Sequence, residues 1–349
     1  MLDISSANLR KMATAWVGNK SRYEGVNLPD QTLTAMNDIV HEIATTTFLR
    51  PFEKNEEFFY FHHEEDVSNH PVFQKCQQIF SNPDSLEIEM AGLVERLYEY
   101  SELPKVRGGE FFVAYFDDLL LAGEPVQGIV MVKVQSKDSY LKTERAGGSF
   151  AISVAEGIST GKLETAAIIF NLDESEGYRI AAIDTVSKKD ERSFWKDEFL
   201  RIRPIEDNYF NTRHHINIAS EFIKDKMPHK FSLDRADQMD LLHRSGLYFK
   251  ENDIFEIDDF TTTMFPEEDQ QEAFKEFRDE YSKAYAAPLE DQFDISGQAA
   301  KKEARLLKSV IKLDKNFQIT VNGRRELIER GFDEDKGKKF YKIYFDDEV

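Results

Sequence analysis

The chain has 349 residues, of which 41% are hydrophobic and 32% are charged, a balance typical of globular proteins long enough for two domains. Its formal net charge of −20 argues against a protein that coats DNA by charge alone, and its single cysteine, Cys76, excludes an internal disulfide. The amino-terminal sequence lacks the apolar core of a signal peptide, and no apolar run approaches the roughly 18–20 residues of a membrane span, so we expect a cytoplasmic protein with no membrane contact.

The charge is distributed unevenly along the chain. Residues 51–102 contain three basic and twelve acidic side chains, and residues 253–294 contain three and fourteen. These two windows account for the whole net charge. Residues 301–325 contain eight basic and two acidic side chains, which predicts a local basic surface on an otherwise acidic protein.

The first part of the chain predicts one strand and three helices. Residues 8–17 alternate loosely between apolar and polar side chains, which favours a strand. A helix is expected from Asp30 as its N-cap to the threonine run at 45–47, because apolar residues recur there at three- and four-residue spacing. Two further helices are expected over residues 71–80 and 84–100.

Four apolar runs rich in β-branched and aromatic residues then follow. They are connected by turn-forming sequences without long helices between them, so neighbouring strands are expected to pair antiparallel. The runs are residues 111–116, 129–134, 165–170 and 178–183. The sequence therefore predicts an α+β fold with an antiparallel sheet of about four or more strands and flanking helices.

Residues 193–227 are expected to be mainly helical, and residues 228–230 form the predicted hinge. This divides the chain into an α+β domain, residues 1–227, and a mainly helical domain with C-terminal strands, residues 228–349. In the second domain we expect a helix over residues 233–249, capped by Ser232. A strongly acidic helix is expected over residues 267–285.

Residues 298–312 have the pattern of an amphipathic helix with basic side chains along one face. Lys301, Arg305, Lys308 and Lys312 are spaced four, three and four residues apart, and Lys302 lies beside them. A basic stripe of this kind can follow a phosphate backbone, although a solvated lysine-rich face has the same pattern. Predicted strands at 317–321 and 340–345 enclose Arg324 and Arg325 and give the chain a short C-terminal hairpin.

Two other groups of side chains suggest metal chemistry. Residues 62–66, His-His-Glu-Glu-Asp, lie close in sequence to His70, but adjacent side chains on one element point apart, whereas metal ligands must converge. Asp117 and Lys137 have the arrangement of a metal-dependent nuclease, except that Gln135 stands where an acidic ligand is expected. We predict no metal site, and the nuclease arrangement is kept as an alternative.

Several stretches resemble the bacterial nucleoid-associated protein family of NdpA type. They consist of scattered identities in the order of strands and helices, and none is a chemical motif. They comprise residues 17–22 (VGNKSR), 109–134, 194–199 (FWKDEF), Asn208-Tyr209, and the tail from Phe317 through Arg325 to Tyr344. The resemblance covers nearly the whole chain and implies contact with DNA in the bacterial nucleoid; it supplies no catalytic residues.

Together these observations predict a nucleoid-associated protein that is not an enzyme, has no cofactor, and binds DNA or RNA. The predicted contacts are Lys301, Lys302, Arg305, Lys308, Lys312, Arg324 and Arg325. No P-loop, dinucleotide fingerprint, nucleophile elbow or H-E-x-x-H motif is present. One alternative is an adaptor whose acidic helix imitates DNA toward a basic nucleoid partner, and the sequence leaves both this route and homo-oligomerisation open.

Overall fold

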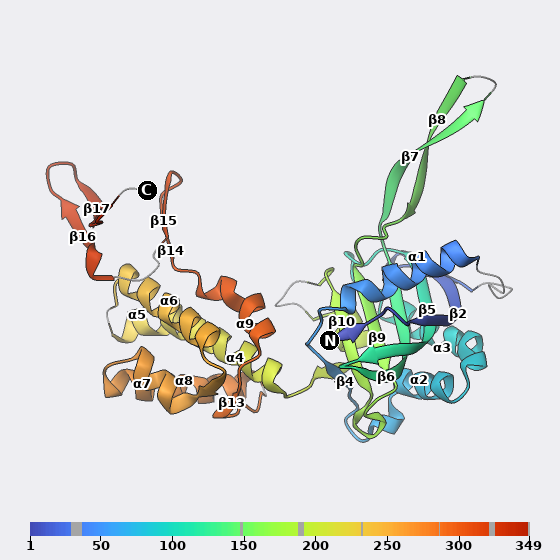
Figure 1. Cartoon of the computed structure of the whole chain (residues 1–349), viewed down its shortest axis with the longest axis horizontal. Helices are drawn as coiled ribbons and strands as arrows, with labels where there is room; N and C mark the ends of the chain where they lie inside the picture. Colours follow the sequence, from blue (N-terminus) through green and yellow to red (C-terminus); the bar gives the residue numbers. More distant parts are fainter. Residues whose placement is uncertain are drawn as a thin grey trace. The chain divides into compact units, whose positions relative to one another are not determined.

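The computed structural model describes residues 1–28, 37–146, 149–187, 192–231, 233–285, 287–320 and 325–347 (Figure 1). The chain forms two compact units, Met1–Ile205 and Glu206–Val349. This division lies earlier than the predicted hinge at 228–230. Apolar residues between the two positions, such as Ile216 and Phe222, belong to the core of the second unit, so the segment that precedes the predicted hinge folds with the residues that follow it.

The first unit is built on a nine-stranded antiparallel sheet, which confirms the predicted α+β class. The strand order is β11-β4-β10-β9-β6-β5-β2-β3, and β1 pairs with β5 beside this path. The strands span Leu2–Asp3 (β1), Asn8–Val17 (β2), Val26–Asn27 (β3), Phe59–Phe61 (β4), Gly109–Leu121 (β5), Glu124–Val134 (β6), Thr165–Phe170 (β9), Arg179–Asp184 (β10) and Ile202–Pro204 (β11). The four predicted runs correspond to β5, β6, β9 and β10.

The central strands β5, β6 and β9 are buried on both faces because the two faces carry separate cores. Successive side chains of a strand point to opposite faces, so Ile129 and Met131 of β6 join one core whereas Val130 and Val132 join the other. Gly109 at the start of β5 is required by close packing, since a Cβ there would lie 1.8 Å from the Val134 carbonyl oxygen.

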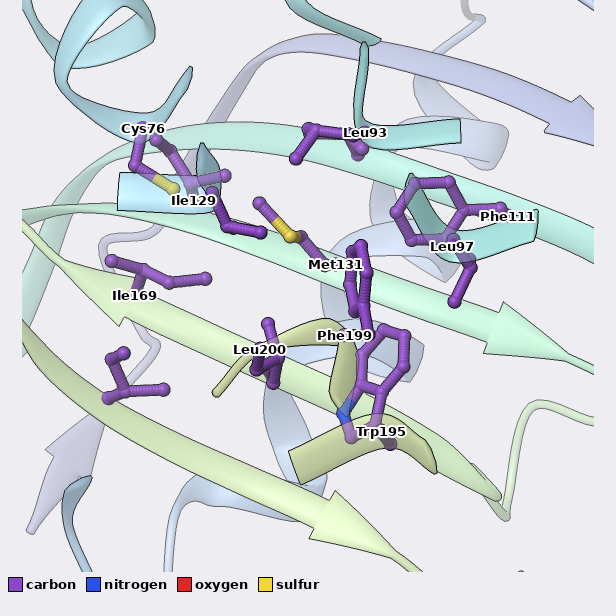
Figure 2. Packing of buried hydrophobic residues seen from close by; sticks show 14 of the residues in the cluster. Cys76, Leu93, Leu97, Phe111, Ile129, Met131, Ile169, Trp195, Phe199 and Leu200 are labelled. Atoms are coloured by element: carbon purple, nitrogen blue, oxygen red, sulfur yellow. The ribbon is translucent and has the colours of Figure 1, made fainter. Parts of the chain in front are cut away.

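One core lies under helices α2 (Pro71–Ser81) and α3 (Leu86–Glu99), both close to their predicted ranges. Figure 2 shows Cys76 of α2 and Leu93 and Leu97 of α3 packed over the strands. A π-helical turn, Phe194–Phe199, closes this core with Trp195, whose indole N–H donates to the Ala166 carbonyl at 3.1 Å. The predicted helix over this stretch is therefore a single wide turn.

The other core lies under α1 (Asp38–Leu49), which differs from the predicted helix. The described helix begins after Asn37, whose side chain accepts the Val40 N–H, and Asp30 lies outside the described residues. The helix also continues through the threonine run, because Phe48 and Leu49 at its end are buried against the sheet. Burial thus outweighs the weak helix propensity of threonine.

The second unit is mainly helical, as predicted. Its helices are α4 (Asn208–Glu221), α5 (Met227–Lys230), α6 (Arg235–Glu251), α7 (Ile257–Met264), α8 (Glu268–Tyr285) and α9 (Gly297–Glu303). The N-cap of helix α6 is Asp234, which forms a capping box with Asp237, and Ser232 lies outside the described residues. The core is rich in aromatic pairs; Phe255, for example, stacks on Phe293 with ring centroids 4.9 Å apart.

Four two-stranded sheets complete the described structure. In the second unit they are β12 (Ile254–Glu256) with β13 (Gln292–Asp294), β14 (Val310–Leu313) with β15 (Phe317–Thr320), and β16 (Ile328–Asp333) with β17 (Lys338–Ile343). Both strands of the predicted C-terminal hairpin are present, but they do not pair with each other: residues 317–320 pair with β14, and the strand near 340–345 is β17, which pairs with β16. In the first unit, β7 (Lys137–Ala146) and β8 (Ser149–Ile158) form a ribbon that extends away from the main sheet (Figure 1).

Candidate nucleic-acid interface

The predicted basic helix over residues 298–312 is wrong in its length. Helix α9 ends at Glu303 and is followed by a 3-10 turn, Ala304–Leu307, after which the chain enters strand β14. The β-branched pair Val310-Ile311 favours a strand, and Asp314, at a φ of 51°, turns the chain so that β15 can pair with β14. Leu307 and Ile311 would be buried in a helix and are also buried in the observed turn and strand, so their four-residue spacing does not distinguish the two conformations.

The four cations of the predicted stripe therefore lie on three kinds of backbone. Lys301 is in α9, Arg305 is in the 3-10 turn, Lys308 follows that turn, and Lys312 is on β14. All four side chains are exposed, and no carboxylate among the described residues forms an ion pair with any of them. We call residues 301–312 the basic segment.

The remaining predicted contacts differ from these four. The Lys302 ammonium donates to the Tyr209 hydroxyl at 2.9 Å and lies 5.5 Å from the centre of that ring, so it holds α9 against α4. Arg324 lies outside the described residues. Arg325 begins a short 3-10 turn, Arg325–Leu327, but its side chain is also outside the description.

The basic segment is held on the second unit by contacts at the end of its 3-10 turn. The Leu306 carbonyl accepts hydrogen bonds from the Ser220 hydroxyl at 3.1 Å and from the Lys224 ammonium. Burial lowers the pKa of Lys224, which lies in the π-helical turn Phe222–Lys226 that follows α4. A cation at the last carbonyls of a helical turn compensates their partial negative charge, so Lys224 fixes the position from which Arg305 and Lys308 project.

A cleft of about 430 Å³ runs between α6 and the basic segment. Its walls are mainly apolar, and three basic side chains, His243, Lys250 and Lys301, contribute to its lining. The apolar lining residues are Ile216, Leu247, Phe249, Ala300, Ala304 and Leu307. An apolar cleft edged by cations suits a ligand that combines flat apolar surface with negative charge, as an unstacked base with its phosphate does.

The acidic helix α8 lies away from the basic segment. Figure 1 shows α7 and α8 along one edge of the second unit, while the hairpins β14–β15 and β16–β17 project from the opposite edge. Several acids near α8 also have cationic partners, among them Asp291 with Arg278 at 2.5 Å and Asp258 with Lys275. These ion pairs offset part of the negative charge on and beside α8.

The residues of the two metal hypotheses do not converge. Lys137 forms an ion pair with Glu110 at 2.5 Å, whereas Asp117 lies seven residues further along β5 beside Arg10, at 3.4 Å. Seven residues of a strand span roughly 23 Å. Gln135 accepts the Arg107 N–H at 2.8 Å. Within the described ranges, no three His, Cys, Asp or Glu side chains come together in a way that could hold a metal ion.

His70, which adjoins the predicted metal cluster, has a structural role. Its Nδ1 accepts the Phe73 N–H at 3.1 Å and caps α2, and its ring lies 4.8 Å from that of Phe61. Burial, with smaller contributions from Arg96 and Arg201, lowers the pKa of His70 to about 3. The side chain is therefore a neutral acceptor at physiological pH.

Sequence reasoning missed one buried cation. Lys133 of β6 is fully buried, donates to the Ser101 hydroxyl at 3.2 Å, and lies 5.7 Å from the centre of the Phe194 ring. Burial lowers its pKa to about 8, partly offset by Glu24. The only signal in the sequence is a lysine inside an otherwise apolar run, GIVMVKV.

Comparisons with known proteins place the chain in a family. None of the described helices has the length and apolar character needed to cross a membrane. No curated protein matches the sequence. The family model described as nucleoid-associated protein YejK matches residues 17–347, which is nearly the whole chain and includes both structural units. The chain therefore belongs to the family of nucleoid-associated protein YejK.

Proposed function

We propose that this nucleoid-associated protein binds DNA directly through its basic segment, acts in the cytoplasm and has no catalytic activity. The observation that carries the proposal is the group of four exposed cations, Lys301, Arg305, Lys308 and Lys312, without ion-pair partners among the described residues. Cations of this kind exchange readily between water and phosphate, whereas cations already paired with carboxylates do not.

The chain's net charge of −20 sets the character of this binding. Repulsion between the acidic surfaces and DNA is screened beyond about one Debye length, so the local cations dominate only when they touch the phosphates. Binding should therefore be short-ranged, and it should depend strongly on salt. Four phosphate contacts give a slope of about −3.6 in log K against log salt, which is a loss of roughly 150-fold between 50 and 200 mM.

Fluorescence anisotropy with a labelled DNA duplex across that salt range tests the proposal. The variant K301E/R305E/K308E/K312E should lose binding at every salt concentration. A matched control, K54E/K162E/K226E/K283E, makes the same change in net charge at exposed lysines elsewhere and should retain most of the affinity. Equal loss in both variants would show that only total charge matters, and unchanged binding by the first would remove the basic segment from the interface.

A single-stranded DNA and an RNA of the same sequence extend the measurement to the apolar cleft beside Lys301. If exposed bases enter it, single strands should bind more tightly than the duplex, and L247E should remove that preference. Failure of the wild-type chain to bind any nucleic acid at 50 mM salt would favour the adaptor alternative. A pull-down that survives nuclease treatment would then test whether a basic protein binds α8.

The absence of catalysis is tested separately. Plasmid DNA incubated with the chain and Mg²⁺ or Mn²⁺ should remain intact, because Lys137 pairs with Glu110 at one end of β5 whereas Asp117 lies beside Arg10, seven residues further along that strand. Cleavage that disappears in both D117A and K137A would contradict this part of the proposal.

A further inference from the structure

The ribbon β7–β8 is the most exposed regular structure in the first unit. Its ten residue pairs run without a break from Lys137 opposite Ile158 to Ala146 opposite Ser149. The ribbon is a sheet of its own, and Figure 1 shows it projecting from the body that carries the main sheet. A two-stranded ribbon is only marginally stable in water unless one face is covered.

One face of the ribbon is apolar. Directly opposed residues of an antiparallel pair lie on the same face, and the face alternates from one pair to the next. Leu141 opposes Val154, Thr143 opposes Ile152 and Arg145 opposes Phe150, so all six share a face. The four large apolar side chains among them are Leu141, Phe150, Ile152 and Val154, which are 72%, 70%, 69% and 69% exposed. Such a contiguous apolar surface marks a binding site.

The opposite face has no such surface. Lys142 and Glu144 lie on it and form an ion pair at 2.5 Å, and their partners across the ribbon are Ser153 and Ala151. Apart from Tyr140, which is 54% exposed opposite Ala155, the side chains of this face are small or polar with internally balanced charge, and such a face needs no partner. The ribbon therefore has one surface to cover, which we call the apolar face. It comprises Ser139, Leu141, Thr143, Arg145, Phe150, Ile152, Val154 and Glu156, with Lys137 and Ile158 on the same side at the base of the ribbon.

Charge distinguishes a protein partner from DNA. The two strands contain three basic side chains, Lys137, Lys142 and Arg145, and three acidic ones, Asp138, Glu144 and Glu156. A ribbon that enters a DNA groove needs an excess of cations to offset the phosphates. A neutral ribbon with a continuous apolar face instead suits another apolar protein surface.

We propose that the apolar face packs against the same face of a second copy of this chain, around a two-fold axis. The distribution of charge along the face supports this partner. At its base the face begins with Lys137, which is already paired with Glu110 of β5. Toward the tip it then presents Glu156, the Leu141–Val154 and Thr143–Ile152 pairs, and finally Arg145 beside Phe150. The apolar pairs thus lie between an acid and a cation.

A two-fold axis that passes midway between the Leu141–Val154 and Thr143–Ile152 pairs brings the apolar pairs of the two copies together and the charged side chains of opposite sign together. It sets each of these pairs against the other pair of the second copy, and it sets Arg145 opposite Glu156 of the partner subunit. Symmetry repeats the ion pair at the other end. Within the described residues Arg145 makes no ion pair of its own; its guanidinium lies 6.0 Å from the centre of the Phe150 ring.

The size of the face sets the expected affinity. Ten residues of an antiparallel strand span roughly 34 Å, and two strands present a face roughly 10 Å wide. This area is below that of a typical stable interface, about 800 Å² on each partner. We therefore expect a dimer that forms and dissociates at micromolar concentrations.

Sedimentation velocity over a range of about 1 to 100 μM tests the proposal with the full chain, in the absence of nucleic acid. The wild type should change from monomer to dimer across this range. Arg145→Glu and Glu156→Arg, each alone, should weaken dimerisation by at least about 10-fold because both ion pairs become repulsive. The control K142E/E144K reverses the pair on the opposite face and should dimerise like the wild type.

Mixing the two single variants provides the decisive measurement. A heterodimer of R145E with E156R contains two attractive pairs again, so the mixture should recover dimers that neither variant forms alone. Recovery also excludes misfolding as the cause of the loss. A wild type that stays monomeric, a mixture that does not recover, or an R145E variant that dimerises normally would each overturn the proposal, and an R145E variant that loses only DNA affinity would assign the ribbon to DNA.

Discussion

Strands β6 and β7 follow one another in the chain, yet they lie in opposite environments. Every residue from Ile129 to Val134 at the end of β6 is at most 7% exposed, including Lys133. In β7 the apolar Leu141 is 72% exposed. The cause is the number of neighbours: β6 lies between β5 and β9 with a core on each face, whereas β7 pairs with β8 alone among the described strands.

The two strands also differ in pattern, and the difference is informative. The end of β6 is a nearly continuous apolar run, the pattern of a strand buried on both faces. The ribbon instead places its apolar residues on one face, the pattern of a strand buried on one side. Within one chain, the apolar side chains of β6 are buried as their pattern predicts, whereas those of the ribbon stay exposed. A second copy packed on the ribbon would remove this discrepancy.

The same substitution in the two environments should give the largest contrast. Ile168→Ala in β9 empties a fully buried position and should reduce the free energy of unfolding by about 2–5 kcal/mol. Ile152→Ala in the ribbon should change it by less than about 0.5 kcal/mol at concentrations where the chain is monomeric. Urea unfolding followed by tryptophan fluorescence measures both, since Trp16 and Trp195 both lie in the first unit.

This contrast would fail if Ile152→Ala destabilised the dilute chain by more than about 1 kcal/mol. The result would mean that the apolar face is already covered within one chain. A cost that appears only at high concentration would instead support the dimer, because association stabilises the folded state by mass action.

The central sheet could be predicted from the sequence because several local signals agreed. Strands β5, β6, β9 and β10 are rich in β-branched and aromatic residues, and the β5–β6 and β9–β10 connections are too short for parallel pairing, whereas the longer β6–β9 connection forms the ribbon. The ribbon was missed because β7 contributes only Leu141, among Ser139, Thr143 and Arg145, as a large apolar side chain to the apolar face, so the apolar–polar alternation of a strand is weak there. Without a neighbouring core to cover one face, such a segment has the composition of a polar loop.

The basic segment shows the limit of periodicity in a short window. Leu307 and Ile311 are four residues apart, which fits one face of a helix, and they are buried even though the chain changes from helix to strand between them. The signal that could have distinguished a strand from a helix here was the β-branched pair Val310-Ile311 followed by the turn residues Asp314 to Asn316. The sequence could name the exposed cations, but their surroundings, such as the cleft beside α6, depend on tertiary packing.

A second contrast concerns lysines. Lys133 in β6 is buried and has a pKa lowered to about 8, whereas Lys142 in the ribbon is exposed and paired with Glu144. Since the folded pKa of Lys133 lies below its unfolded value of about 10.4, the unfolded chain binds more protons between these values, and the contribution of Lys133 to stability rises with pH there. The penalty for burying its charge is fully present below pH 8.

Lys133→Met should therefore stabilise the chain at pH 7 by about 2–3 kcal/mol, and the gain should shrink as the pH is raised toward 10. The measurement is the difference in urea-unfolding free energy between variant and wild type at each pH, which cancels the titration of other groups. Lys142→Met is the control and should show no such trend. A variant that is destabilised at pH 7 would show that the Lys133 ammonium has a compensating anionic partner.

The smallest of the three expected effects is a loss of stability at acid pH. It should arise in the main body of the first unit and not in the ribbon. The pKa of His70 is lowered to about 3, so the folded chain keeps this side chain neutral while the unfolded chain protonates it near pH 6.5. Between these values the unfolded state binds more protons, so stability falls as the pH falls, by about 2 kcal/mol between pH 7 and pH 5. His70 is the N-cap of α2, which packs on the main sheet, so its protonation should destabilise that part of the chain; the ribbon contains no histidine.

Asparagine at position 70 sharpens the test, because its side-chain oxygen can accept the Phe73 N–H and cap α2 without titrating. His70→Asn should therefore retain most of the stability at pH 5 that the wild type loses, whatever its stability at pH 7. His62→Asn, which changes a histidine just after β4 that is neither a helix cap nor fully buried, should leave most of the acid sensitivity in place. Equal acid sensitivity in His70→Asn and the wild type would show that protonation of another group, such as the buried His215 of the second unit, limits stability instead.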